Sequence, residues 1–206
     1  MCWILLATLF SALPAAAQES EVTGLTLEDV AARLSEPQVL RGRFSQTRDI
    51  ALLSRPLESS GIFILSAKGL YWEQQQPFSS VLIADGERLA QRLADGPLII
   101  MDNSRQPLVL SFSKIFLNMF RGEHADLEQH FSIRFQAEAN TWHIDLSPTG
   151  FPLSEGINNI QLSGRDHIDL ITVNGSDISD TMTIRFSALQ TDPPALTEYE
   201  TELYAW

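Results

Sequence analysis

The sequence predicts a mainly β fold built on one large antiparallel sheet, either a sandwich or a barrel. Between Val39 and Phe186, most segments alternate apolar and polar side chains with the period of two expected of strands. Turns rich in Gly, Asn and Asp separate these segments at even intervals. Two segments of the chain show helical spacing instead, so we expect short helices beside the sheet.

The first 17 residues are expected to form a secretory signal. An uncharged apolar run from Trp3 to Leu13 precedes Ala15, Ala16 and Ala17, and cleavage fits best after Ala17. No Lys or Arg precedes the run, which indicates an upstream start or an atypical signal. A buried N-terminal strand or helix is the alternative. Cleavage leaves residues 18–206 (206 minus 17, or 189 residues), enough for a single domain.

Cysteine usage and charge exclude several classes. The only cysteine, Cys2, lies in the predicted signal, so the mature chain has neither a disulfide nor a thiolate nucleophile. A cysteine for lipid attachment would follow the apolar run, so we expect a soluble periplasmic protein. The 26 acidic and 14 basic residues give a net charge of −12. Nucleic acids and anionic membrane surfaces require clustered cations, so neither is expected as a partner.

The first half of the chain predicts one helix and six strands. Leu25 to Leu34 has a single apolar stripe, with Thr26 and Asp29 placed as a capping box and Pro37 as the stop. Asp85-Gly86 and Asp95-Gly96 are turn signals. The predicted strands are Val39–Asp49, Leu57–Ser66, Leu70–Glu73, Ser80–Ala84, Glu87–Arg92 and Leu98–Met101.

The second half opens with an apolar helix and returns to strands. Phe112 to Arg121 places five large apolar side chains at helical spacing, and Gly122 is a suitable closing residue. The strands predicted after it are Phe131–Phe135, Trp142–Leu146, Ile157–Ser163, His167–Val173 and Met182–Phe186. The tail from Asp192 onward has no assignment.

One strand carries more apolar surface than a sheet with one wet face needs. Gly61 to Leu65 is apolar on both faces, which predicts cover on both sides. The helix Phe112 to Phe120 is expected to cover one side. Two interpretations remain: an ordinary core, or a sheet that curls around a cavity with apolar helices as its lid.

Catalytic and metal-binding patterns are weak. None of the four histidines lies in a nucleophile-elbow or zincin motif. His143 alternates with Trp142 and Ile144, which predicts a solvent-facing position. His124 and His130 are better explained as surface residues than as a metal site, and no carboxylate pair stands out. We therefore expect no enzyme activity, no metal and no cofactor.

The order of motifs in residues 25–90 resembles the LolA family of periplasmic carriers of outer-membrane lipoproteins. After a signal and a short helix, the family has a Phe-Ser/Thr-Gln strand, a Gly before its second strand, an aromatic-Trp pair, a Pro, and an apolar run into Asp-Gly. The corresponding segments here are Gly42 to Gln46, Ser60 to Ile64, Leu70 to Glu73, Gln76-Pro77 and Val81 to Leu89.

This resemblance implies an incomplete antiparallel barrel with a lid of short helices and an apolar cavity. It also implies a monomeric carrier that takes an acylated lipoprotein or another envelope lipid from an inner-membrane exporter to an outer-membrane acceptor, as part of outer membrane biogenesis. The family often has an Arg-Pro before the aromatic-Trp strand, and that Arg ties barrel to lid. Here the segment is Ser66 to Leu70, so Lys68 is the candidate tether. The predicted cavity lining is Phe63, Leu65, Trp72, Phe112, Phe116, Met119, Phe131, Phe135, Trp142 and Ile144.

The carrier hypothesis has two alternatives. The first is a chaperone-like, non-catalytic envelope module that binds proteins along an exposed sheet edge. The second is a hydrolase whose site leaves no recognisable pattern. Lipid that co-purifies with the protein would favour the carrier over the chaperone-like module.

Overall fold

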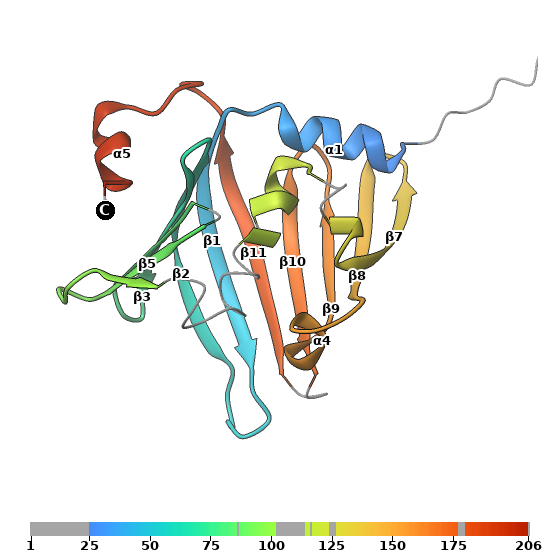
Figure 1. Ribbon diagram of the computed structural model, residues 1–206, viewed down its shortest axis with the longest axis horizontal. Coiled ribbons are helices and arrows are strands. Elements are labelled where there is room, and N and C mark those ends of the chain that lie inside the picture. The colour runs from blue at the N-terminus through green and yellow to red at the C-terminus, as the bar shows by residue number, and fades with distance from the viewer. Residues whose placement is uncertain are drawn as a thin grey trace, which may run out of the picture.

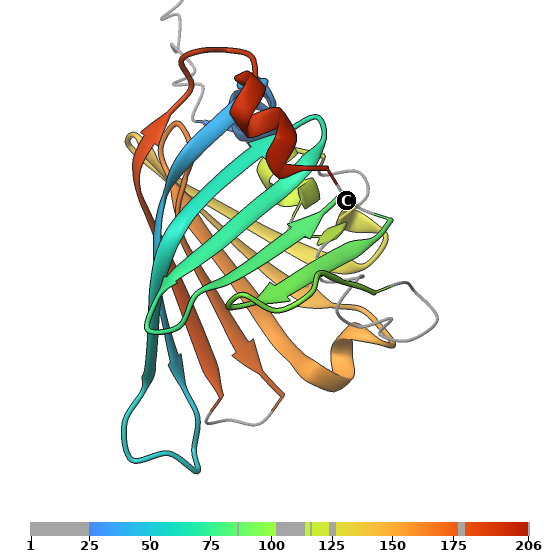
Figure 2. The ribbon, with the colours of Figure 1, turned by 90° about the vertical axis from the view of Figure 1, so that its left-hand side faces the viewer.

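The protein forms one curved sheet of eleven antiparallel strands. The computed structural model describes residues 25–85, 87–101, 114–115, 117–123, 127–176 and 180–205, so the predicted signal lies outside the described residues. The strand order is β6-β5-β4-β3-β2-β1-β11-β10-β9-β8-β7. Within the described part of the chain, β6 and β7 have no partner on their outer edges, which makes the sheet an incomplete barrel (Figures 1 and 2).

The strands follow the chain in two runs joined by the pairing of the first strand with the last. The first run is β1 (Val39–Asp49), β2 (Leu57–Ser66), β3 (Gly69–Gln76), β4 (Ser80–Ala84), β5 (Leu89–Leu93) and β6 (Ile99–Met101). The second run is β7 (Phe131–Glu138), β8 (Thr141–Pro148), β9 (Ile157–Gly164), β10 (Ile168–Gly175) and β11 (Thr181–Gln190).

All eleven predicted strands are present, three of them with the predicted bounds. The others differ mainly at their ends, where polar residues hide the pattern. β3 continues through Gln74 to Gln76 because these residues still pair with β2 and β4, although they have little apolar surface. β11 extends to Gln190 because β1 pairs with it as far as Arg41. Pairing with a neighbour, rather than burial, sets these strand ends.

Helix α1 (Leu27–Ser35) confirms the predicted amphipathic helix. Thr26 is the N-cap, and its hydroxyl and the Asp29 carboxylate form the predicted capping box with each other's backbone N–H. The helix therefore starts two residues later than predicted. Its apolar stripe, Val30, Ala31 and Leu34, is buried against the inner, concave face of the sheet. Figure 1 shows α1 lying across one end of the half-barrel.

The predicted second helix is present at all of its described positions. Residues 114–115 and 117–121 are helical, whereas Phe112 and Phe116 lie outside the described residues. Gly122, at φ +67°, closes the helix as predicted. Its N–H donates to the Met119 carbonyl and that of Glu123 to the Asn118 carbonyl, which is a Schellman motif. We call residues 117–121 the lid, because they lie inside the curve of the sheet (Figure 1).

A second apolar cluster lies on the outer face of β1 to β5. The C-terminal segment, with α5 (Glu198–Leu203), packs over one end of this face and was not assigned from the sequence. Tyr204 packs there beside Tyr71, and its hydroxyl donates to the carbonyl oxygens of Ile64 and Gly69. The predicted cover on both sides of Gly61 to Leu65 is therefore confirmed: Phe63 and Leu65 face the inner cluster, and Ile64 the outer. A short helix, α4 (Leu153–Gly156), precedes β9 and was also not predicted.

Candidate functional site

The inner face of the half-barrel brings the described members of the predicted cavity lining together. They come from the two halves of the sheet and from the lid, and all belong to one apolar cluster. Within it, Trp72 and Phe135 are partly buried and the others are buried; these are Phe63, Leu65, Met119, Phe131, Trp142 and Ile144. Phe112 and Phe116 lie outside the described residues. His143 is exposed on the opposite face of β8, as predicted.

An aromatic group forms the floor of this interior. The rings of Phe44 and Trp72 stack with centroids 3.7 Å apart. Phe186 meets Phe63 edge-on at 5.2 Å, and Phe120 of the lid meets Phe186 edge-on, also at 5.2 Å. Such offset and edge contacts are favourable beyond the area that they bury. The lid is therefore held by specific ring contacts with the sheet.

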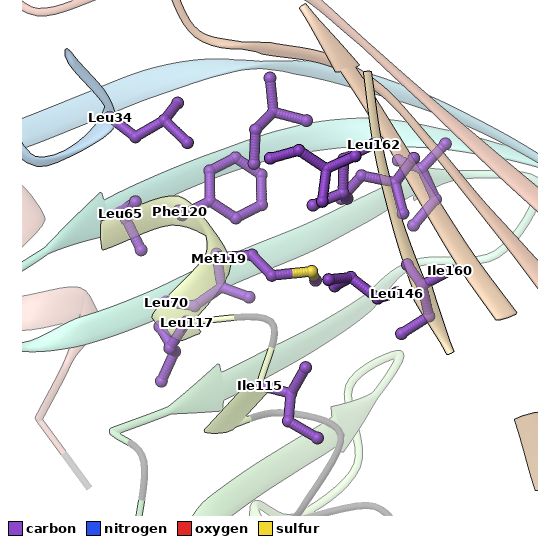
Figure 3. Close-up of a cluster of buried hydrophobic side chains, with 14 of the residues drawn as sticks. Leu34, Leu65, Leu70, Ile115, Leu117, Met119, Phe120, Leu146, Ile160 and Leu162 are labelled. Atoms are coloured by element: carbon purple, nitrogen blue, oxygen red, sulfur yellow. The ribbon is translucent and has the colours of Figure 1, made fainter. Parts of the chain in front are cut away.

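Lid side chains occupy the interior in this conformation. Leu117, Met119 and Phe120 are 1%, 2% and 3% exposed. Figure 3 shows Met119 reaching toward Leu146 and Ile160, while Phe120 lies nearer Leu34 and Leu65. An apolar space beneath α1, bounded by Leu34, Met119 and Ile144 among others, measures about 20 Å³. That volume is close to one water molecule. Among the described residues, the side chains of the lid thus occupy the interior, and a ligand could enter it only by displacing them.

The lid and α1 are in backbone contact at Gly122. A Cβ added at Gly122 would lie 2.1 Å from the carbonyl oxygen of Ala31 in α1. Only glycine permits this approach, and the positive φ of Gly122 also favours glycine. The end of the lid and the middle of α1 therefore form one close-packed unit over the mouth of the sheet.

The lid reaches the rim of the barrel through an arginine. The Arg121 guanidinium donates to the backbone carbonyl of Ser66, at the end of β2, over 3.3 Å. Lys68, the predicted tether, lies two residues further on in the β2–β3 turn, and its side chain is exposed. The backbone N–H of Lys68 donates to the Ser66 hydroxyl. The side chain that joins lid and rim is therefore an arginine of the lid, Arg121, whereas the predicted tether, Lys68, belongs to the rim.

The C-terminal segment is fastened by Arg41 of β1. Its guanidinium donates to both carboxylate oxygens of Glu200, with its Nη2 2.8 Å from Oε2, and to the carbonyls of Pro193 and Ala195. Both side chains of the ion pair are nearly buried, at 13% and 12% exposed. The hydrogen bond from Arg41 lowers the pKa of Glu200 to about 2. Burial raises the pKa of Tyr204 to about 12. This end of the chain is therefore an integral part of the fold.

Sequence reasoning missed four contributors to this region. Phe44 and Phe186 belong to the aromatic floor, Phe120 packs on it from the lid, and Arg121 joins lid to rim. A signal for the phenylalanines was present, since each occupies an apolar position in a segment assigned correctly. No comparable signal marked Arg121.

The described residues contain neither a helix that could span a membrane nor a cluster that could bind a metal ion. No described helix is both long and apolar enough to pass through a membrane. Among those same residues, no three His, Cys, Asp or Glu side chains cluster in a way that could hold a metal ion.

The sequence matches a family model described as outer membrane lipoprotein carrier protein LolA-like, over residues 16–180. It is 29% identical over 204 residues to an outer-membrane lipoprotein carrier protein of Dechloromonas aromatica (strain RCB), an alignment that covers 94% of this chain and 89% of that protein.

Similar solved structures include two from other bacteria. A putative outer membrane lipoprotein-sorting protein domain from Vibrio parahaemolyticus has a TM-score of 0.49 and 8% identity, and the match covers 88% of this chain and 98% of that one. A LolA superfamily protein from Nitrosomonas europaea has a TM-score of 0.47 and 8% identity, with 85% and 96% covered.

Proposed function

The chain belongs to the LolA-like family of outer membrane lipoprotein carrier proteins, and from this premise we propose that it is a periplasmic, non-catalytic carrier of acyl chains. In this proposal it takes up the acyl groups of a lipoprotein or another envelope lipid at the inner membrane and releases them at the outer membrane. The observation that carries the proposal is the interior of the half-barrel, which is apolar and occupied by side chains of the lid.

The free energies involved favour a lid whose side chains leave the interior when an acyl chain enters it. Exposing a chain of about sixteen carbons to water costs on the order of 12 kcal/mol, at about 0.8 kcal/mol per methylene. Withdrawing three buried lid side chains, Leu117, Met119 and Phe120, costs about 1.5–3 kcal/mol each. The free energy gained by burying the acyl chain exceeds the cost of withdrawing the lid by roughly 5 kcal/mol. This difference corresponds to a Kd in the sub-millimolar range. A carrier that must give up its cargo needs such a moderate affinity.

Native mass spectrometry of the protein purified from the periplasm tests this proposal. We expect a co-purified acylated molecule, and saturable uptake of a fluorescent sixteen-carbon fatty acid after its removal. Leu162→Trp enlarges a side chain that lines the interior and should abolish uptake in protein that circular dichroism shows to be folded, whereas Gln161→Trp, on the exposed face of the same strand, should not. A bare polypeptide mass together with no saturable uptake would contradict the proposal.

A second candidate function, a protein-binding envelope module, is favoured by one observation. The edge strand β6 leaves Ile99 and Ile100 56% and 51% exposed, and no described strand pairs with its outer edge. An exposed apolar edge is a template for strand addition. Retention of a partner protein by wild type but not by Ile100→Lys, with no acyl uptake by either, would favour this function over the carrier.

A further inference from the structure

A groove opens at the mouth of the half-barrel, outside the interior. It measures about 710 Å³ and lies between the end of α1, the β2–β3 turn, the lid and the C-terminal segment. Leu34, Leu65, Phe120 and Leu196 give it apolar walls. In Figure 3, Leu34, Leu65 and Phe120 lie together at one end of the buried cluster. The groove is therefore large enough for part of an acyl chain, whereas the space beneath α1 is not.

Side chains of α1 and of the lid separate the groove from the interior. Leu34 borders both the groove and the space of about 20 Å³ beneath α1. Neighbouring lid residues divide in the same way, since Phe120 borders the groove and Met119 borders the inner space. A chain lying in the groove would thus reach the interior by displacing Leu34 and the end of the lid, without crossing the sheet.

The rim of the groove is cationic in an acidic protein. Lys68 and Arg121 line it together with one acidic residue, Glu123, whereas the whole chain carries a net charge of −12. Neither cation forms a salt bridge with any residue that the structure describes. The nearby Arg41 is different, because Glu200 already neutralises it. Two cations in the lining of a groove with apolar walls complement a hydrocarbon chain that ends in an anion.

We propose that this groove is the entrance for a single acyl chain with an anionic head group, which Lys68 and Arg121 hold at the rim. This inference rests on the proposed carrier function and specifies the ligand class and its path. A carboxylate or phosphate is a stronger acceptor for the Arg121 guanidinium than the neutral Ser66 carbonyl. The head group therefore competes with the Ser66 carbonyl for the Arg121 guanidinium, which weakens a lid-to-rim hydrogen bond as the chain arrives.

Three ligands with the same sixteen-carbon chain test the head-group site: palmitate, hexadecyl phosphate and hexadecanol. We expect wild type to bind one or both anions at least tenfold more tightly than hexadecanol, since a charge-assisted hydrogen bond contributes about a tenfold effect or more. The two anions distinguish a fatty-acid carboxylate from a phosphate head group. The preference should shrink at high salt.

Two substitutions locate the site. Lys68→Gln and Arg121→Gln should each lower the ratio of anion affinity to hexadecanol affinity by about tenfold. Lys68 is exposed, so its substitution leaves the fold intact. Arg185→Gln makes the same charge change at an exposed position of β11 and should leave the ratio unchanged.

The outcomes separate this inference from the carrier function. If wild type binds all three ligands equally, or the Lys68 and Arg121 variants keep the full ratio, the head-group site is wrong and the carrier function stands. If none of the ligands binds, both are wrong.

Discussion

Truncating a lid residue should destabilise the protein and yet strengthen its binding of acyl ligands. Met119 is 2% exposed and borders an internal space of only about 20 Å³, so little relaxation can follow its truncation. Met119→Ala should therefore cost about 3 kcal/mol, within the range for buried methionines. If the lid leaves the interior before the ligand occupies it, this cost falls on the closed state alone. At 1.4 kcal/mol per factor of ten, acyl affinity rises by up to roughly 100-fold.

Ile83→Ala is the matched control. Ile83 of β4 is also buried, but it belongs to the apolar cluster on the outer face of the sheet, away from the lid and the interior. It should cost similar stability without raising affinity. Urea unfolding gives the first quantity, and titration with a fluorescent sixteen-carbon fatty acid gives the second. If Met119→Ala lowers stability and binds the ligand no better than wild type, the exchange between lid and cargo is refuted.

Three further predictions concern the parts that hold the mouth of the barrel. Because its folded pKa of about 2 is below the unfolded value of 4.5, Glu200 stabilises the fold above pH 4.5, by about 3 kcal/mol, and this is lost as the pH falls toward 2. Urea unfolding of Glu200→Gln should show that loss at pH 7 and a flatter profile from pH 4.5 to 2; a profile like that of wild type would exclude the pair with Arg41 as the cause. Gly122→Ala should lower the free energy of unfolding in urea by at least about 2 kcal/mol, since a Cβ there meets the Ala31 carbonyl at 2.1 Å and φ is positive; an unchanged free energy of unfolding would contradict the close contact with α1. Trp142→Phe should cost about 1–3 kcal/mol in thermal unfolding, because the indole N–H donates to a backbone carbonyl at 2.7 Å; no loss would show that water replaces this donor.

The strands and the first helix could be predicted because their signals are local. Thr26 and Asp29 specify the start of α1 through contacts three residues apart. Alternation around Trp142 and Ile144 specifies which face of β8 is buried. The double-sided apolar run at Gly61 to Leu65 even indicated that both faces of β2 are covered. Each of these inferences needs only neighbours along the chain.

What could not be predicted depends on contacts between distant segments. Glu200 is separated from Arg41 by 159 residues, and no local pattern indicates that they pair. Short α5 has no buried residue of its own, so it shows no apolar stripe. Nothing in the local sequence distinguishes Arg121 from other arginines at helix ends, because its partner, the Ser66 carbonyl, lies on β2. The sequence likewise indicated surplus apolar mass without showing that the lid itself fills the interior.

Hydrogen exchange of the lid, with and without bound ligand, tests the central claim most directly. The backbone amides of residues 117–121 should exchange slowly in the ligand-free protein, because Leu117, Met119 and Phe120 are buried. Saturation with a sixteen-carbon fatty acid should accelerate exchange in the lid while strands β1 and β2 stay protected. Lid amides that exchange at the same rate or more slowly with ligand bound would contradict displacement of the lid by cargo.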